Sequence, residues 1–124
     1  MDRVFLLIGA LAAGLGVAMG AFGAHGLRAR LTVEMLAVFE TGVRYHVYHA
    51  LALLATALLL GRPEFQTSRL IIASGWLFLG GILLFSGSLY LLAVTGIRPL
   101  GAITPIGGVA FLIAWALLAI AAIR

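Results

Sequence analysis

The side chains of this chain that could do chemistry gather in one short segment, RYHVYH, at Arg44–His49. Histidine and tyrosine can donate and accept hydrogen bonds, and two histidines three residues apart on a helix can converge on a metal ion. His46 and His49 have this spacing, and the third histidine is His25. No carboxylate is expected beside these histidines, so we expect no metal site and no cofactor.

Patterns typical of catalysis are absent from the chain. The segment FSGSL at Phe85–Leu89 lacks the two glycines that flank the single serine of a nucleophile elbow. The segment GAFGAHGL at Gly20–Leu27 lacks the lysine and the preceding strand of a phosphate-binding loop. Cysteine does not occur, which excludes thiol nucleophiles, disulfides and thiolate zinc sites. We therefore expect no catalytic residue and no enzymatic activity.

The elements that must position these side chains are membrane helices. Of the 124 residues, 64% are hydrophobic and only 10% are charged, which is far outside the composition of soluble globular proteins. Long apolar stretches can cross a hydrocarbon core that is ~30 Å thick. We expect an all-α membrane protein, a single domain over residues 1–124, in which four transmembrane helices form an antiparallel bundle. The expected helices are residues 3–24, 33–61, 68–94 and 104–123.

Several residues signal where these helices begin and end. Thr32 and Ser68 are suitable N-caps, and Thr104 followed by Pro105 is typical of a helix start. Gly26 can adopt the left-handed conformation that closes a helix. Because the connecting loops are short, helices that are consecutive in the chain should be antiparallel neighbours.

The second expected helix carries the RYHVYH segment into the membrane. Its uninterrupted apolar part, Ala50–Gly61, has a length of only ~18 Å at ~1.5 Å per residue, which is too short to span the core. Counting ~20 residues back from Gly61 places the boundary near Gly42 and puts His49 ~10 Å deep. An unpaired polar side chain is costly at that depth, so this segment should face other helices or a wet cavity.

Polar side chains of the second helix share one face, and the third helix offers groups that could bond them. We expect a buried polar centre made of residues from these two helices: Thr41, Tyr45, His49, Ser86 and Tyr90. His49 should bond a tyrosine or serine of the third helix, whereas His46, on another face, should be the more replaceable histidine. Glu40 and Arg44, four residues apart, should form an ion pair near the membrane boundary.

The first expected helix carries a ridge of small residues, which recur every fourth position: Ala12, Gly16, Gly20 and Ala24. In lipid, a small-xxx-small ridge lets two helix backbones approach closely, and dispersion then holds them together. We expect this ridge to pack against another helix, either within the chain or in a second copy. It is the expected contact if the protein forms a homo-oligomer.

The basic residues indicate membrane lipids, not nucleic acid, as partners. The formal net charge is +4, and the eight basic residues are all arginines scattered near segment ends instead of gathered in a run. Four crossings would place four arginines on each side of the membrane. The positive-inside rule therefore does not decide the orientation.

The chain contains four motifs in order: GAFGAHGL (Gly20–Leu27), FETGVRYHVYHALALL (Phe39–Leu54), GILLFSGSLYLLAVTG (Gly81–Gly96) and LGAITPIGG (Leu100–Gly108). Together they resemble the bacterial family called domain of unknown function 423, which is related to the eukaryotic transmembrane protein 256. The resemblance implies a small multi-pass protein of the bacterial inner membrane, without an established activity. The chain departs from the family pattern at His46, a position where glutamine often occurs. The family's polar signature falls on His25, Glu40, Thr41, Arg44, Tyr45, Tyr48, His49, Ser86, Ser88, Tyr90, Thr104 and Pro105.

These observations favour a structural membrane module, or one that binds a lipid or small amphiphile. The polar residues then serve as interhelical hydrogen bonds or line a cavity. The alternative is a small transporter or channel built from several copies, because one bundle of four helices rarely encloses a wide path.

Overall fold

Four helical spans form the chain, and the computed structural model describes residues 1–124. Each span is long and apolar enough to cross a membrane, which confirms the expected fold. The turns η1 and η2 are π-helical and continue the helices beside them, and η3 is a 3-10 turn. The elements in chain order are α1 (Asp2–Ala21), η1 (Phe22–Gly26), α2 (Val33–Leu60), α3 (Arg69–Gly81), η2 (Ile82–Ser86), α4 (Gly87–Thr95), η3 (Arg98–Ala102) and α5 (Thr104–Ala122).

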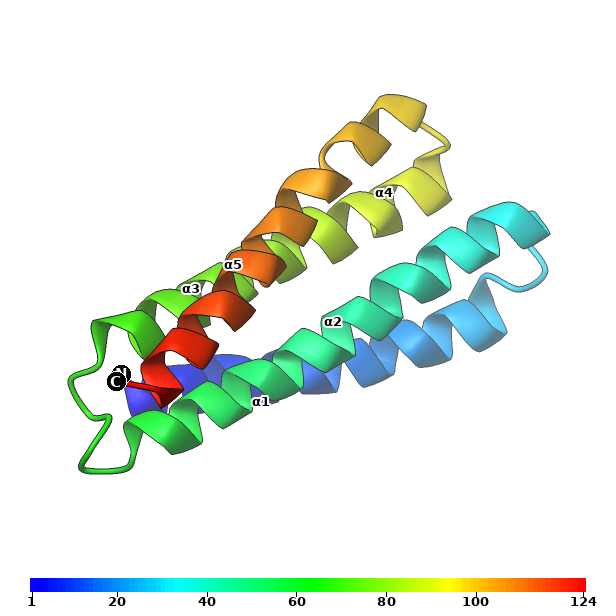
Figure 1. Ribbon diagram of the computed structural model, residues 1–124. Helices are drawn as coiled ribbons and strands as arrows, with labels where there is room; N and C mark the ends of the chain where they lie inside the picture. The colour runs from blue at the N-terminus through cyan, green and yellow to red at the C-terminus, as the bar shows by residue number, and fades with distance from the viewer.

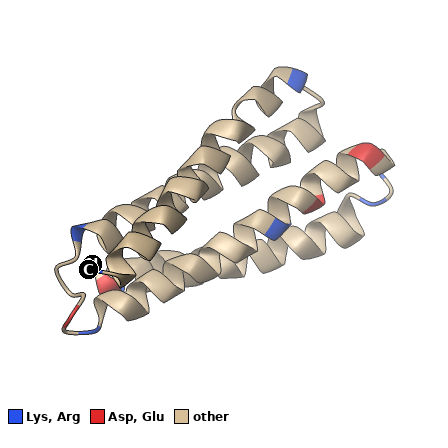
Figure 2. Cartoon of the chain, in the orientation of Figure 1, with Lys and Arg blue, Asp and Glu red and all other residues tan.

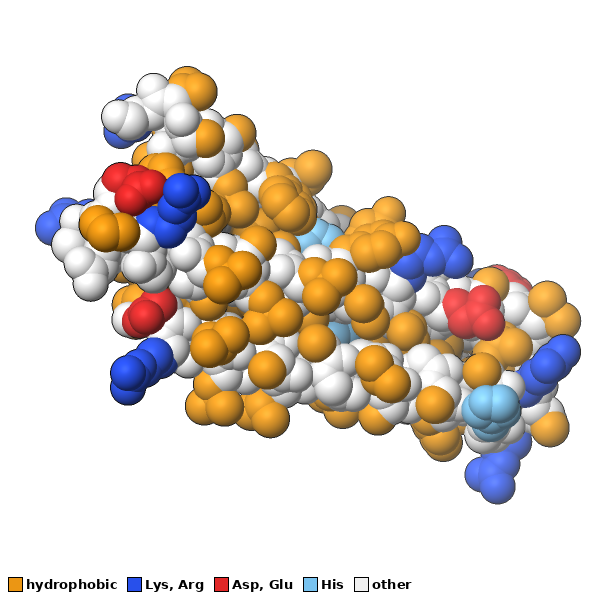
Figure 3. Space-filling view, turned by 90° about the horizontal axis from the view of Figure 1, so that it is seen from below, with side chains coloured by type: hydrophobic (Ala, Val, Ile, Leu, Met, Phe, Trp, Pro, Cys, Tyr) orange, Lys and Arg blue, Asp and Glu red, His pale blue; other side chains and the backbone are white.

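The spans are arranged as two helical hairpins, one made of α1 and α2 and the other of α3–α4 and α5 (Figure 1). Both chain termini lie at the end of the bundle that also holds the α2–α3 loop, and the hairpins diverge toward the opposite end. The elements α3, η2 and α4 together form the third span. α2 packs against α1 on one side and against the third span on another, and α5 packs against the third span. Hydrophobic side chains cover much of the long face seen in Figure 3, while charged residues are concentrated toward the ends.

The main core lies where the hairpins are close together. Phe5, Leu53 and Phe78 are fully buried there, and they come from the first, second and third spans. The ring of Phe5 covers Gly75 so closely that a Cβ atom at this glycine would lie 2.5 Å from the ring. Aromatic rings that pack directly on glycine backbone therefore hold the two hairpins together at the end where they are close.

The helix ends follow the sequence signals in part. Thr32 caps α2, because its hydroxyl accepts a hydrogen bond from the backbone N–H of Met35 (3.2 Å), which confirms that expectation. The expected left-handed cap at Gly26 is wrong: the π-helical turn η1 extends the first helix to this residue, and Gly96 (φ +70°) is the residue with a left-handed backbone. The expected N-cap at Thr104 is also wrong: Thr104 is the first residue of α5, Ile103 is the N-cap residue, and no side chain makes a capping bond there.

The small-residue ridge of α1 faces α2 within the same chain. A Cβ atom at Gly16 would lie 2.8 Å from the Cγ2 atom of Val47, and one at Gly20 would lie 3.4 Å from Val43. Ala12 is half-buried, whereas Ala24 is exposed and takes no part in the contact. The ridge is therefore occupied inside the protomer, which leaves it unavailable as a contact between copies.

We expect the substitution Gly16→Ala to lower the thermal stability of the detergent-solubilised protein by a modest amount. The added methyl group must displace Val47, and such overpacking costs ~1 kcal/mol when the neighbour is the end of a side chain. Gly14→Ala is the matched control, because a Cβ atom at Gly14 would meet nothing within 4 Å. Equal melting temperatures for the two variants would contradict a close α1–α2 contact at Gly16.

Candidate functional site

The structure separates the expected polar centre into distinct contacts. His49 and Ser86 are buried, but Tyr45 is 39% exposed. The hydroxyl of Thr41 donates to the carbonyl oxygen of Ala37 in its own helix (3.0 Å). The expectation of one buried cluster is therefore wrong: Thr41 bonds its own helix, and Tyr45 lies half-exposed against the ring of Phe85 (centroids 4.8 Å apart).

His46 joins three spans of the bundle. Its side chain is only 2% exposed, and its Nε2 atom donates to the carbonyl oxygen of Ala12 in α1 (2.8 Å). Because a carbonyl oxygen only accepts, Nε2 carries the proton and Nδ1 accepts from the hydroxyl of Tyr90 in α4 (2.8 Å). The expectation that His46 is the more replaceable histidine loses its basis, since the face on which it lies points into the bundle between α1 and α4.

His49 has a different set of partners on another side of α2. Its Nδ1 atom donates to the carbonyl oxygen of Tyr45 (2.7 Å), so Nε2 is the acceptor for the indole N–H of Trp115 in α5 (3.2 Å). His49 faces the interior, as expected, and is 5% exposed. The expected partner, a tyrosine or serine of the third span, is wrong: the side chain that bonds His49 is Trp115 of α5.

The two rings that share this bond belong to a group of six aromatic rings from α2, the third span and α5. We call them the aromatic cluster: Tyr45, His49, Phe78, Phe85, Phe111 and Trp115. The rings of His49 and Phe111 are stacked, with centroids 3.4 Å apart and an interplanar angle of 5°. Phe78 meets Trp115 edge-on at 4.9 Å. The aromatic cluster thus connects α5 to α2, two helices that otherwise have few contacts.

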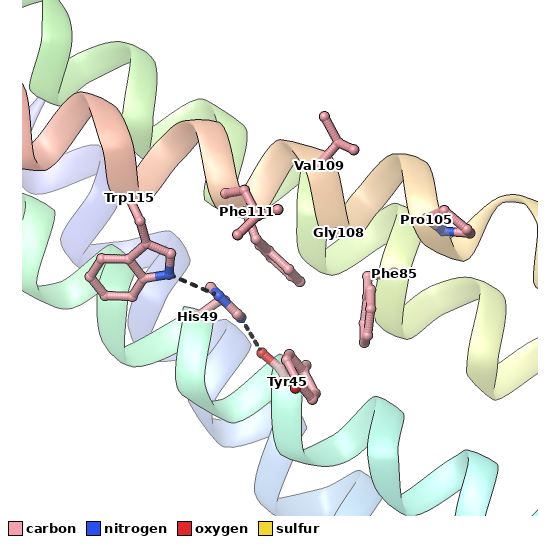
Figure 4. A pocket seen from close by; sticks show the side chains of 9 residues that line it. Tyr45, His49, Phe85, Pro105, Gly108, Val109, Phe111 and Trp115 are labelled. Atoms are coloured by element: carbon pink, nitrogen blue, oxygen red, sulfur yellow. Dashed lines mark hydrogen bonds between the residues drawn. The ribbon is translucent and has the colours of Figure 1, made fainter.

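A cavity of about 490 Å³ opens beside the aromatic cluster (Figure 4). Val109, Leu112 and Trp115 line it and are themselves exposed, so the cavity opens sideways through the surface that faces lipid. Figure 4 shows His49 between Trp115 and Tyr45, with Phe111 beside it and Phe85 farther along, next to Tyr45. The lining residues are Tyr45, His49, Phe85, Pro105, Gly108, Val109, Phe111, Leu112 and Trp115.

Two serines fix the part of the third span that bears Phe85. The hydroxyl of Ser86 donates to the carbonyl oxygen of Gly42 in α2 (2.6 Å). The hydroxyls of Ser88 and Thr104 lie 2.6 Å apart and bond α4 to α5. Thr104 therefore connects two helices instead of capping one. Since η2 ends at Ser86, the π-helical turn and these bonds together set where Phe85 meets the cavity.

Four other residues of the family's polar signature lie on the surface: His25, Glu40, Arg44 and Tyr48. Glu40 and Arg44 form no ion pair, since the two ion pairs of the structure are between the N-terminus and Asp2 and between Arg62 and Glu64. The expected pair is therefore absent. Both side chains extend from a face of α2 that no other helix covers, where a local pair contributes little.

Sequence reasoning missed the aromatic residues of the third and fourth spans. Phe111 and Trp115 are four residues apart on α5 and therefore share a face. This spacing could have indicated an aromatic face on α5, but no polar residue lies near Phe111 and Trp115 in the sequence. The segment therefore resembles an ordinary apolar stretch. The partner of His49 could be identified only from the packing of α5.

The site offers a largely apolar and aromatic surface. Both nitrogens of His46 and of His49 are engaged in hydrogen bonds. Nowhere in the structure do three or more His, Asp or Glu side chains come close enough to hold a metal ion. The cavity presents aliphatic side chains and aromatic faces, and Tyr45, whose hydroxyl has no hydrogen-bond partner within the chain, is one of its lining residues. These groups suit an apolar ligand with a polar end.

Comparison with known proteins yields sequence relatives but no structural one. A family model described as "Protein of unknown function (DUF423)" matches residues 19–108. The UPF0382 membrane protein YwdK of Bacillus subtilis (strain 168) is 50% identical over 122 residues, which are 98% of each chain. The UPF0382 membrane protein SSP2132 of Staphylococcus saprophyticus is 48% identical over 118 residues, 95% of each chain. No solved structure matches.

Proposed function

Because the chain belongs to DUF423, a family whose function is unknown, we propose from the geometry alone that it is a membrane module that binds one amphiphile in the lateral cavity. It is a multi-pass protein of the bacterial cell membrane, and its four apolar spans fit the name membrane protein that its relatives carry. The proposed ligand places a hydrocarbon chain against the aromatic cluster. The proposal assigns no catalytic role to any residue.

The single observation that carries this proposal is the cavity between α2, η2 and α5. Its volume of about 490 Å³ lies within the ~300–1,000 Å³ that is usual for small-molecule sites. Its walls are apolar and aromatic, which suits a hydrocarbon chain, and Tyr45 at its edge supplies a hydroxyl for a polar end. Its side opening lets a ligand enter from the bilayer without crossing water.

The closed inner wall of the cavity supports binding more than transport through it. The stacked rings of His49 and Phe111 and the bond from Trp115 close the cavity toward the bundle interior. A path across the membrane that runs through this cavity would have to break these contacts. No observation favours the transporter or channel alternative.

We expect a brominated fatty acid to quench the fluorescence of Trp115 in a saturable way when the protein is in vesicles of unbrominated phospholipid. The chain has two tryptophans, each 48% exposed, and only Trp115 lines the cavity. The variant Trp76→Phe reports on Trp115 alone, and Trp115→Phe reports on Trp76 alone. Bromine atoms held in the cavity quench the first signal to a plateau, whereas bromine atoms free in the bilayer quench the second signal in proportion to their concentration.

A cavity-filling variant with a matched control tests where the fatty acid binds. In the Trp76→Phe background, Gly108→Leu should abolish the saturable quenching, because its side chain extends into the cavity. A Cβ atom at Gly108 would lie 3.8 Å from Phe85, so the fold should tolerate the change. Gly14→Leu, on the exposed face of α1, should leave the saturation unchanged. Identical, non-saturable quenching of the two tryptophans would overturn the proposal.

A further inference from the structure

One face of α2 is uncovered along most of its length. α1 packs on one side of this helix and the third span on another. We call the remaining side the outer face of α2. At 100° per residue its members fall within an arc of about 80°. All of them are exposed: Glu40, Arg44, Tyr48, Leu51, Ala55 and Leu58.

Two of these exposed residues are charged, and Arg44 lies deeper in the bundle than Glu40. Gly20 of α1 packs against Val43 of α2, so Arg44 lies about level with Gly20. Gly20 is six residues before the end of η1 at Gly26, which places Arg44 ~9 Å from that end of the first span at ~1.5 Å per residue. Figure 2 shows that the basic and acidic residues lie toward the ends of the bundle except for those along α2. Hydrocarbon does not solvate a guanidinium at this level, whereas Glu40, one turn (~6 Å) nearer the end of the bundle, lies only ~3 Å from that end.

We propose that the outer face of α2 packs against the same face of a second copy of this chain. The charges on the face are complementary to themselves: Glu40 is acidic, Arg44 is basic, and neither has an ion partner within the chain. A twofold axis along the membrane normal brings each Glu40 near Arg44 of the partner subunit and so forms two reciprocal ion pairs.

The depth of these residues requires the two copies to run in the same direction. Glu40 and Arg44 lie closer to Val33 than to Leu60, so antiparallel copies would place them in opposite halves of the bilayer. In parallel copies the two residues are offset by ~6 Å along the helix, a distance that the long arginine side chain can bridge. Beyond them, Leu51, Ala55 and Leu58 continue the face with the three- and four-residue spacing of packed parallel helices.

Single cysteines test the contact, because the natural chain has none. In vesicles at low protein density, Ala55→Cys and Leu58→Cys should form disulfide-linked dimers when an oxidant is added. Leu112→Cys is the matched control on α5: Leu112 is 72% exposed and Leu58 is 71% exposed. The control should stay monomeric. Equal dimer yields at Leu58→Cys and Leu112→Cys, or no dimer at either, would overturn the proposal.

Charge variants decide whether the ion pairs form between copies. In the Leu58→Cys background, Glu40→Arg has two basic residues on the outer face and Arg44→Glu has two acidic ones. Each variant alone should lose most of its disulfide-linked dimer through like-charge repulsion. A mixture of both, carrying different tags, should restore the yield as heterodimer, because all four charges then find opposite partners. A pair confined to one helix predicts no such preference, so a mixture without excess heterodimer would contradict the proposal.

Discussion

The substitution Gly107→Ala is expected to destabilise the protein more than an alanine at Gly14, Gly16 or Gly108, because Gly107 packs on backbone atoms of another helix. Gly107 is buried in α5 and packs directly on the backbone of Phe85 in η2, where a Cβ atom would lie 2.8 Å from Cα and closer still to the backbone nitrogen. A backbone cannot rotate away as a side chain can. The helices must separate, at a cost of ~3 kcal/mol.

A neighbouring glycine supplies the control for this prediction. A Cβ atom at Gly108 would meet only the ring of Phe85, at 3.8 Å, which is an ordinary contact. Gly108→Ala should therefore keep the melting temperature of the natural chain in detergent, while Gly107→Ala should lower it by many degrees. Saturable quenching of Trp115 should also be lost in Gly107→Ala, because the cavity lies between the two helices that separate. Similar melting temperatures for both variants would show that α5 does not pack on η2 in this register.

The substitution His46→Leu is expected to have the second largest effect, a loss of ~2 kcal/mol of stability. Interhelical hydrogen bonds in membrane proteins contribute ~0.6–1.7 kcal/mol each, and His46 makes two, to Ala12 and to Tyr90. Leucine fills similar space but leaves the Tyr90 hydroxyl without an acceptor in the interior of the bundle. Thermal unfolding in a mild detergent, followed by circular dichroism, measures the loss.

Two further variants identify the hydrogen bonds as the cause. His46→Gln should retain much of the stability, because an amide offers a donor for Ala12 and an acceptor for Tyr90. Tyr90→Phe should cost less than His46→Leu, and combining it with His46→Leu should add little, since the shared bond is already lost. Strictly additive losses in the double variant would mean that His46 and Tyr90 do not interact.

The sequence by itself determined the membrane class and the four spans. Burial of apolar surface in a bilayer depends on length and composition, and both are local properties that can be read along the chain. The N-cap at Thr32 is also local, because its bond reaches only to Met35. Four motifs were sufficient to indicate the family, and the matches to DUF423 and to its relatives confirm it.

Only the tertiary structure decided which polar residue meets which partner. A helical wheel gives the angle between His46 and His49, but not which neighbouring helix lies at each angle. The π-helical turn η2 also changes the direction of side chains that follow it, and no residue type in ILLFS signals such a turn. The bond from Trp115 to His49 joins residues 66 positions apart, so it depends on how α5 packs against the third span. The sequence could place His49 inside the membrane, but its partner and the cavity beside it arise from contacts between helices that are distant in the chain.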